Sequence, residues 1–287
     1  MDNLKDPKVF HPAYIPDNIK LRDEANWIAT ALINHIDRNM IEYIYLAGLT
    51  GSGKTVTVRY LTNKMKEYAK EKGIELPIIY VPCYVYNTSY SALRMVTDSP
   101  QGTSWSLLVE RAIKKISGKK TVVIIDDIDK LSDTRFYRPK WATDDPCYTD
   151  RCAPKRRPSK LPLVKAIPEI LYLLFENTDA SVVFVSDSPL WLETLDPDFV
   201  GRYMPERIFF PPYTSADLYS ILKQRAELGL HSYDEKGLEY IANFVARFYH
   251  GNAGIAIRAL YDAGSKNKWG KEEIERFFRL SPSIEKA

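Results

Sequence analysis

The fold is decided by one stretch of the chain, Tyr43-Ile44-Tyr45-Leu46-Ala47-Gly48-Leu49-Thr50-Gly51-Ser52-Gly53-Lys54-Thr55. An apolar run that favours a β-strand leads into a glycine-rich turn, and a helical pattern follows from Val56 to about Lys72. The spacing G-x-x-x-x-G-K-[ST] between a strand and a helix is typical of a phosphate-binding loop. An ordinary glycine-rich turn before a helix is the weaker interpretation. The sequence therefore predicts a nucleotide-binding protein.

The loop also predicts how the nucleotide binds. Glycines let the backbone turn its N–H groups inward around phosphates, and the start of the next helix adds partial positive charge. Lys54 is expected to reach the β- and γ-phosphates, and Thr55 to ligate Mg²⁺. ATP and Mg²⁺ are the predicted cofactors. The residues of the loop expected to contact the nucleotide are Gly48, Leu49, Thr50, Gly51, Ser52, Gly53, Lys54, Thr55 and Val56.

The composition of the 287 residues, 45% hydrophobic and 27% charged, is that of a soluble globular protein. No apolar run reaches membrane-spanning length and the N-terminus has no signal-peptide pattern, so we expect a cytoplasmic protein without a membrane partner. Three cysteines fit a reducing compartment. The net charge of +3 is only mildly basic, so any contact with nucleic acid must come from local patches.

Hydrophobic periodicity predicts strands that alternate with helices up to about residue 211 and helices alone after it. The expected strands are the apolar run that begins at Tyr43 and the stretches 78–81, 121–127, 181–186 and 207–210. The expected helices are 21–40, 56–72, 105–116, 163–175, 215–228, 234–249, 252–265 and 271–278. Residues 1–20 should form an extended arm, 82–105 a less regular segment, and 132–160 an inserted loop. The fold class is therefore α/β, a parallel sheet between helices (residues 1–211) followed by a small all-helical domain (212–287).

Acidic residues follow the strand at 121–127, where an open parallel sheet places its ligands. Asp126 is expected to hold Mg²⁺ beside Thr55, with a helix-capping role as the alternative. Asp127 is a candidate general base for the attacking water. Asp129 is interpreted as a cap or a structural partner. Asp187, after the next strand, either touches the γ-phosphate or belongs to a polar turn.

Two arginines lie between the strand at 181–186 and the helical domain. In ring- or filament-forming ATPases an arginine in this place enters the neighbouring subunit's site and stabilises transition-state charge. Arg202 is the candidate for this role and Arg207 lies close to it in the chain. A solvated arginine is the alternative. The predicted catalytic residues are thus Asp127, Asp187 and Arg202.

These residues resemble the AAA+ ATPases and, within them, the initiator group, which comprises the replication-origin recognition and helicase-loader ATPases of archaea and eukaryotes. The similarity covers most of residues 9–280. It includes Tyr14-Ile15-Pro16 with Arg22, Val81-Pro82-Cys83, Thr88-Ser89-Tyr90, Leu195-Asp196-Pro197, Arg202, Phe210-Pro211-Pro212-Tyr213-Thr214, Gln224-Arg225-Ala226-Glu227 and Gly251-Asn252-Ala253. The resemblance implies a five-stranded AAA+ sheet, a helical lid over the nucleotide and ATP-dependent assembly on DNA. It further implies that Tyr14 and Ile15 pack near the adenine.

The chain departs from the family pattern in four respects. Asp127 stands in place of the usual catalytic Glu, and Asp187 in place of the sensor-1 Asn. Gly254 replaces the usual sensor-2 Arg, for which Arg258, one helical turn later, is a candidate substitute. The chain also ends after the lid, without room for the winged-helix domain of cellular initiators. Together these departures predict slow hydrolysis, or a switch that binds ATP and rarely hydrolyses it.

Contact with duplex DNA would fall to residues 84–105 and to the loop at 132–160, where lysines and arginines can meet phosphates. The loop mixes basic and aromatic residues: Arg135, Phe136, Tyr137, Arg138, Lys140, Trp141, Arg151, Lys155, Arg156, Arg157 and Lys160. This mixture suits DNA, an acidic protein partner or solvent. Cys147 and Cys152 lack a second Cys/His pair nearby, so a local disulfide or free thiols are favoured over zinc.

The sequence thus predicts an ATP-binding AAA+ ATPase that self-associates, or joins a related AAA+ subunit, through Arg202 and acts on duplex DNA, as in replication initiation or helicase loading. One alternative is a target regulator of DNA transposition. Another is a largely non-hydrolysing nucleotide switch that binds a protein partner through the 132–160 loop. The sequence leaves open the DNA site, the number of subunits and the partner.

Overall fold

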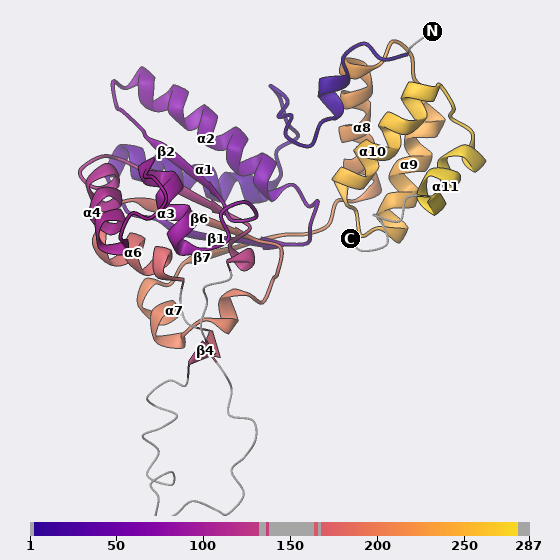
Figure 1. Cartoon of the computed structure of the whole chain (residues 1–287). Coiled ribbons are helices and arrows are strands. Elements are labelled where there is room, and N and C mark those ends of the chain that lie inside the picture. The colour runs from indigo at the N-terminus through magenta and orange to yellow at the C-terminus, as the bar shows by residue number, and fades with distance from the viewer. Residues whose placement is uncertain (1–2, 132–135, 138–163, 166–167, 281–287) are drawn as a thin grey trace, which may run out of the picture. The chain divides into compact units, whose positions relative to one another are not determined.

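The computed structural model describes residues 3–131, 136–137, 164–165 and 168–280 (Figure 1). The chain divides into two compact units. The first unit consists of residues 1–29, 48–64 and 209–287, and the second of residues 30–47 and 65–208.

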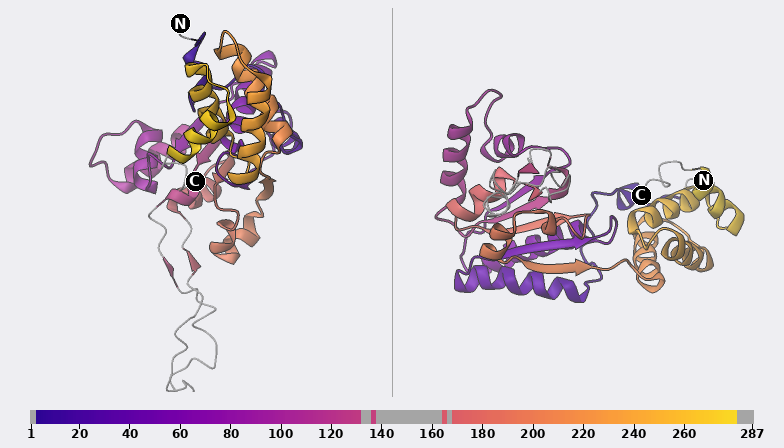
Figure 2. Two further views of the ribbon diagram at one scale, coloured as in Figure 1. Left: turned by 90° about the vertical axis from the view of Figure 1, so that its right-hand side faces the viewer. Right: turned by 90° about the horizontal axis from the view of Figure 1, so that it is seen from below.

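A five-stranded sheet has the strand order β2 (Ile78–Pro82), β3 (Val122–Asp126), β6 (Ser181–Ser186), β1 (Tyr43–Gly48) and β7 (Glu206–Phe210). The pairs β2–β3, β3–β6 and β1–β6 are parallel, and strands of the sheet lie side by side in the right-hand view of Figure 2. In register, Ala47 is opposite Ser186, and Pro82 is opposite Asp126. The carboxyl ends of these strands therefore lie along one edge of the sheet. The predicted parallel α/β sheet is confirmed.

Helices cover the sheet, so the residues of its three central strands β3, β6 and β1 are almost all buried. On one face, alternate strand residues such as Tyr45, Val123 and Phe184 pack into a core with three helices. These helices are α3 (Ser89–Thr97), α4 (Trp105–Ile116) and α6 (Glu169–Asn177). Stacked rings extend this core, with Phe175 4.0 Å from Tyr43 and 5.2 Å from Phe199 between ring centroids. The remaining long helices are α1 (Asp23–Arg38) and α2 (Lys54–Glu71).

A second core lies among four helices that follow the sheet: α8 (Ser215–Gly229), α9 (Glu235–Phe248), α10 (Ala253–Lys266) and α11 (Lys271–Leu280). Three of them begin at a side-chain cap, which satisfies N–H groups that a helix start leaves without partners. Thr214 and Asp217 form a capping box on α8, while Asp234 and Asn252 cap α9 and α10. The predicted all-helical segment is thus present, with its boundaries set by these caps.

The N-terminal arm packs against these helices. Leu4 pairs with Leu230 in an antiparallel bridge, and the Asn3 side chain donates to the carbonyl oxygens of Ser232 (2.8 Å) and Gly264 (3.0 Å). Within the arm, Pro7–Phe10 form a short 3₁₀ helix, whose Phe10 belongs to the helical core. The arm is therefore part of the first unit, together with the glycine-rich loop and the four helices.

Several local expectations were wrong. The segment 82–105, expected to be irregular, contains α3, which Thr88 and Ser91 start with a capping box and Asp98 ends in the left-handed conformation. The helix expected from residue 163 begins at Glu169, because Pro168 disfavours a helix before it. Residues 164–165 instead form β5 (Val164–Lys165), which pairs with β4 (Phe136–Tyr137). A further helix that was not expected is α7 (Pro197–Tyr203).

Most of the predicted loop at 132–160, including Cys147 and Cys152, lies outside the described residues. The predicted boundary between residues 211 and 212 stays a prediction, although β7 ends at Phe210 and α8 begins at Ser215. No helix in the described part of the chain has the length and apolarity needed to cross a lipid bilayer.

Candidate functional site

The glycine-rich loop joins the end of β1 to the start of α2 within the first unit. Gly51 and Gly53 adopt φ angles of +79° and +91°, a region of backbone conformation that residues with a Cβ rarely enter. The buried ammonium group of Lys54 donates to the carbonyl oxygens of Gly48 and Leu49, both at 2.9 Å. The loop thus curls around the positive charge of Lys54, as a phosphate-binding loop requires.

Residues of the helical segment rest directly on this loop. A Cβ on Gly51 would lie 2.2 Å from Asn252 Oδ1, so only glycine fits there. The same Asn252 oxygen caps α10 by accepting the Ile255 N–H at 3.1 Å. The neighbouring Ala253 N–H donates to the Gly51 carbonyl at 3.1 Å. Helix α10 therefore begins on the loop, which was not predicted in this detail from the Gly251-Asn252-Ala253 motif.

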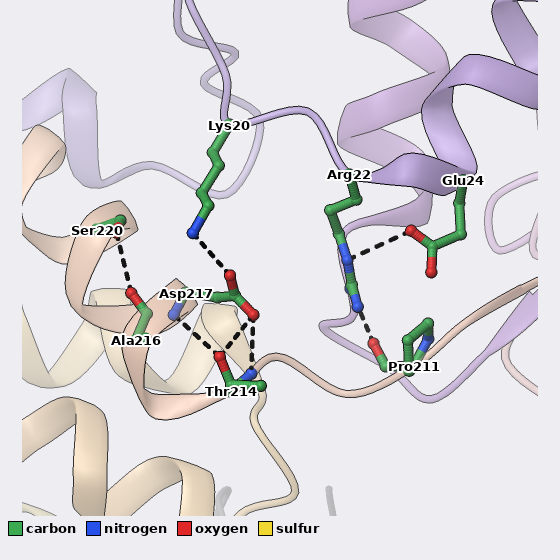
Figure 3. Close-up of polar contacts among 8 residues, drawn as sticks. All are labelled: Lys20, Arg22, Glu24, Pro211, Thr214, Ala216, Asp217 and Ser220. Atoms are coloured by element: carbon green, nitrogen blue, oxygen red, sulfur yellow. Dashed lines mark hydrogen bonds and ion pairs between the residues drawn. The ribbon is translucent and has the colours of Figure 1, made fainter.

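Arg22, at the end of the N-terminal arm, joins the loop to the entry of the helical segment. Figure 3 shows its contacts with Pro211 and Glu24. Its Nη1 atom donates to the Pro211 carbonyl at 2.8 Å and to the Ser52 carbonyl at 3.3 Å. Its Nε atom lies 3.6 Å from a Glu24 carboxylate oxygen, and its guanidinium carbon lies 4.7 Å from the centre of the Tyr213 ring. One side chain thus contacts the loop, the end of the sheet and α1.

A second contact of the arm lies beside the first in Figure 3. Lys20 Nζ donates to Asp217 at 2.8 Å, in the first turn of α8. Partial burial would raise the pKa of the Asp217 carboxyl, but hydrogen bonds from Lys20 and Thr214 outweigh it and lower the pKa. The carboxylate is therefore held in its charged form at this helix start.

The two residues expected near the adenine, Tyr14 and Ile15, are both partly buried in the arm. Arg225 of α8 donates to the Tyr14 carbonyl at 3.2 Å and to the Val9 carbonyl, and its guanidinium carbon lies 4.7 Å from the Tyr14 ring centre. Burial lowers the pKa of Arg225. The first unit thus contains the whole loop together with Tyr14 and Ile15. Arg258 is also in this unit, exposed on α10.

The acidic candidates belong to the second unit. Asp126 is buried at the end of β3, and its carboxylate accepts a hydrogen bond from the Tyr80 hydroxyl of the neighbouring β2. The next residue, Asp127, is partly buried and has a left-handed backbone with φ of +56°. Burial, followed by the charge of Asp126 and then that of Asp187, raises the pKa of Asp127 to about 6. The β3 end is therefore a site where negative charge is concentrated.

Asp129 ties the ends of β3 and β6 together. Its Oδ1 atom accepts from the Ser186 hydroxyl at 3.1 Å and from the Asp187 N–H at 3.2 Å, and it pairs with Lys130. Asp129 is thus the structural partner that the sequence indicated. It fixes the backbone of Asp187 at the carboxyl end of the sheet, beside Asp126 and Asp127 in the same unit.

Both candidate arginines carry ion pairs within the second unit. Arg202 Nη1 lies 2.8 Å from Glu176, and Arg207 Nη1 lies 2.6 Å from Glu193. The Arg202 side chain is 64% exposed, and exposed ion pairs contribute little free energy. Arg202 can therefore exchange Glu176 for an acceptor on another molecule at small cost.

Sequence reasoning missed the contacts of Tyr80, Arg22 and Tyr213. Tyr80 lies two residues before Pro82, the register partner of Asp126, so only strand order brings its hydroxyl to that carboxylate. Arg22 and Tyr213 appear in the family resemblance, but nothing in the sequence indicates that they touch each other. The cap at Asn252 had a signal that could have been used, an Asn immediately before a helical pattern.

The donor set fits ATP and Mg²⁺. Lys54 supplies a positive charge inside a loop of backbone amides, which suits phosphate oxygens. The Thr55 hydroxyl and the Asp126 carboxylate are hard oxygen donors of the kind that Mg²⁺ prefers beside phosphates. The structure thus contains the residue types that both groups need, in the two units described above.

Comparisons with known proteins agree with this chemistry. Residues 42–143 match the model of an AAA domain. The chain is 27% identical over 278 residues to the ORC1-type DNA replication protein 1 of Methanosarcina mazei, covering 91% of this chain and 59% of that protein. It is 28% identical over 266 residues to the ORC1-type DNA replication protein 2 of Haloarcula marismortui, covering 88% of this chain and 58% of that protein. The chain thus spans about three fifths of the length of these curated relatives.

Solved structures show the same fold. The Aeropyrum pernix ORC1 protein, determined in complex with DNA, matches with a TM-score of 0.72 and 23% identity over 95% of this chain and 68% of that one. Cdc6p of Pyrobaculum aerophilum matches with a TM-score of 0.68 and 22% identity, over 92% of this chain and 66% of that one. The chain therefore has the fold of these proteins.

Proposed function

We propose that this chain, an AAA+ protein of the initiator type by its AAA domain and its similarity to ORC1-type proteins, is an ATP-binding switch of DNA replication. In this proposal it binds ATP with Mg²⁺, self-associates or joins a related AAA+ subunit, and acts on duplex DNA. The observation that carries the proposal is the glycine-rich loop closed around Lys54 and held by Asn252 and Tyr213.

Each residue of the loop has a chemical task in this proposal. When ATP binds, the Lys54 ammonium group gives up its hydrogen bonds to the carbonyl oxygens of Gly48 and Leu49 and donates to phosphate oxygens instead. Its positive charge then offsets the negative charge of the ligand. The loop amides donate to the remaining phosphate oxygens. Thr55 and Asp126 hold Mg²⁺, which when bound neutralises part of the phosphate charge. The arm residues Tyr14 and Ile15 pack near the adenine, and Arg258 stands in for the sensor-2 arginine.

The acidic cluster supports slow hydrolysis. Asp127 is the candidate base for the attacking water, but its side chain is one methylene shorter than that of Glu, so its carboxylate reaches less far towards that water. Asp187, in the place of the sensor-1 Asn, adds a further negative charge near the expected position of the γ-phosphate, which it would repel. We infer that ATP binding is the regulated step and that turnover is slow.

Assembly and DNA contact complete the proposal. The A. pernix ORC1 protein was determined with DNA, and the curated relatives are named as replication proteins. The exposed Arg202 is the candidate that enters a neighbouring subunit's site. Residues 84–105 offer the exposed side chains of Tyr84 and Val85 for contact with a duplex or a partner.

The test is to measure ATP binding, ATP hydrolysis and DNA retention with the wild-type chain and with Lys54→Ala. We expect ATP binding by the wild type, a loss of affinity of roughly 10- to 100-fold in the variant, the size of a charge-assisted contact, and DNA retention that needs ATP. Lys64→Ala, on the exposed side of the same helix, is the matched control. Unchanged ATP affinity in Lys54→Ala would contradict the proposal.

A second candidate is a nucleotide switch that binds a protein partner without hydrolysing ATP. The short side chain of Asp127 and the negative charge of Asp187 favour it. Tight ATP binding with neither turnover nor DNA retention in the same experiment would identify this function.

A further inference from the structure

We propose that Arg22 is a positioning residue of the phosphate-binding loop, which fixes the peptide between Ser52 and Gly53 so that the Gly53 N–H is ready for a phosphate. This inference rests on the proposed ATP site. It concerns the first unit alone, which contains Arg22, the loop and the start of the helical segment. Figure 3 shows Arg22 with Glu24 and Pro211.

Arg22 links the phosphate-binding loop to the segment that follows the last strand of the sheet. Its Nη1 atom donates to both the Ser52 carbonyl and the Pro211 carbonyl, at 3.3 Å and 2.8 Å. Glu24 lies 3.6 Å from its Nε atom and balances its charge. The guanidinium plane is further held by the Tyr213 ring, 4.7 Å away. Four groups therefore fix the guanidinium, and the Ser52 carbonyl is fixed in turn.

Fixing that carbonyl also fixes an amide. A peptide unit is planar, and in the trans form its C=O and N–H point in opposite directions. No cis peptide bond occurs in the described residues, so the Ser52–Gly53 unit is trans. Because Arg22 holds the Ser52 oxygen, the Gly53 N–H must point to the opposite side of the peptide. A donor that is already oriented loses less freedom when a phosphate binds.

Gly53 needs this support more than most residues. It has a φ of +91° and no side chain, so its own backbone freedom is large. Tyr213 restrains it from one side, since a Cβ on Gly53 would lie 2.0 Å from the Tyr213 hydroxyl. Arg22 contacts both Tyr213 and the Ser52 carbonyl, so it restrains the same peptide through two groups.

The experiment compares Arg22→Met with Lys20→Ala. Both variants remove a cation that ties the arm to the start of the helical segment, but only Arg22 touches the loop. Two quantities are measured: the Kd values for ATP and ADP, and the hydrogen exchange rate of the Gly53 amide without nucleotide. We expect Arg22→Met to raise the Kd values for ATP and ADP about tenfold, which is the size of one charge-assisted hydrogen bond. We also expect it to speed hydrogen exchange at the Gly53 amide. Lys20→Ala should change neither quantity by more than about twofold.

Arg22→Lys keeps the charge but lacks the planar fork, so its Kd values should fall between those of the wild type and Arg22→Met. This variant also serves if Arg22→Met fails to fold. Unchanged Kd values and unchanged Gly53 exchange in the Arg22 variants would overturn the role of Arg22. Equal losses in Lys20→Ala would overturn it as well, because they would indicate a general effect of the arm. A wild-type chain that binds neither nucleotide would instead refute the proposed function.

Discussion

The hydroxyl of Tyr213 lies so close to Gly53 that a Cβ added to the glycine would stand 2.0 Å from the oxygen. Tyr213 follows the last strand of the sheet, and Gly53 is the last glycine of the loop, so 160 residues of chain separate two groups in direct contact. Burial raises the pKa of the Tyr213 hydroxyl above its ordinary value of 10. The loop is therefore shaped in part by a residue that lies far from it in sequence.

Gly53→Ala is expected to disturb the loop through both backbone strain and this contact. Gly73→Ala is the matched control, since Gly73 also has a positive φ, of +71°, but a Cβ there would have nothing within 4 Å. A left-handed alanine costs about 1–2 kcal/mol, and overpacking adds about 1–3 kcal/mol. Gly53→Ala should therefore lower the free energy of unfolding, measured with urea, by more than Gly73→Ala. Equal effects of the two substitutions would show that the Tyr213 side chain moves away from the added methyl group without cost, which contradicts the prediction.

Tyr80→Phe should weaken the binding of Mg²⁺. It should leave the binding of nucleotide in the absence of Mg²⁺ unchanged. The Tyr80 hydroxyl donates to the Asp126 carboxylate, and partners that orient a metal ligand are typically worth 10- to 100-fold in metal affinity. We expect the Mg²⁺ concentration needed for half-maximal stimulation of ATP binding to rise about tenfold. Affinity for ATP in the presence of EDTA should stay the same.

The control for this substitution is Tyr84→Phe, which removes a hydroxyl from a side chain that is 78% exposed just beyond the same strand. It should leave the Mg²⁺ dependence unchanged. If Tyr80→Phe matches this control, the hydrogen bond to Asp126 has no part in metal binding.

Arg202→Ala should impair hydrolysis but leave ATP binding intact, because the proposed role of Arg202 is in a neighbouring subunit's site. Such arginines contribute about 10³-fold or more to turnover in related mechanisms. Arg207→Ala is the comparison, since Arg207 has a similar exposed ion pair with Glu193. Turnover at saturating ATP and sedimentation with ATP are the measurements. A larger loss in Arg207→Ala than in Arg202→Ala would reassign the role.

Asp217→Asn should destabilise the helical segment in a manner that depends on pH. Hydrogen bonds lower the pKa of Asp217 below its ordinary value of 3.8 in the folded chain. A lowered pKa stabilises the fold above the ordinary pKa, and this stabilisation is lost as the pH falls through the folded pKa. The variant should therefore lose about 1 kcal/mol at pH 7, as when a helix cap is removed, and less below about pH 4. Urea unfolding of both chains at several pH values measures this, and a difference independent of pH would contradict it.

The hydrophobic periodicity of the sequence predicted an element correctly where the residues of that element alone determine its conformation. The strand predicted at 181–186 and the helix predicted at 105–116 agree with β6 and α4 at both ends. Their apolar periodicity and flanking polar residues suffice to predict them, because the spacing of apolar residues shows which faces of the element will be buried. The helix α3 was missed because its start depends on the reciprocal cap between Thr88 and Ser91, a weaker signal than hydrophobic periodicity.

The order of residues is enough to predict the loop, the strand before it, the helix after it, and the acidic residue Asp126 at the end of a buried strand. Each of these depends on neighbours within a few residues, where chemistry and spacing act locally. Three features appear only when the chain is folded: β3 lies beside β2, Tyr80 reaches Asp126, and Arg22 and Tyr213 hold the loop. These contacts join residues 30 to 190 positions apart, and they form because burying two apolar cores leaves one arrangement of strands and helices in which buried polar groups find partners.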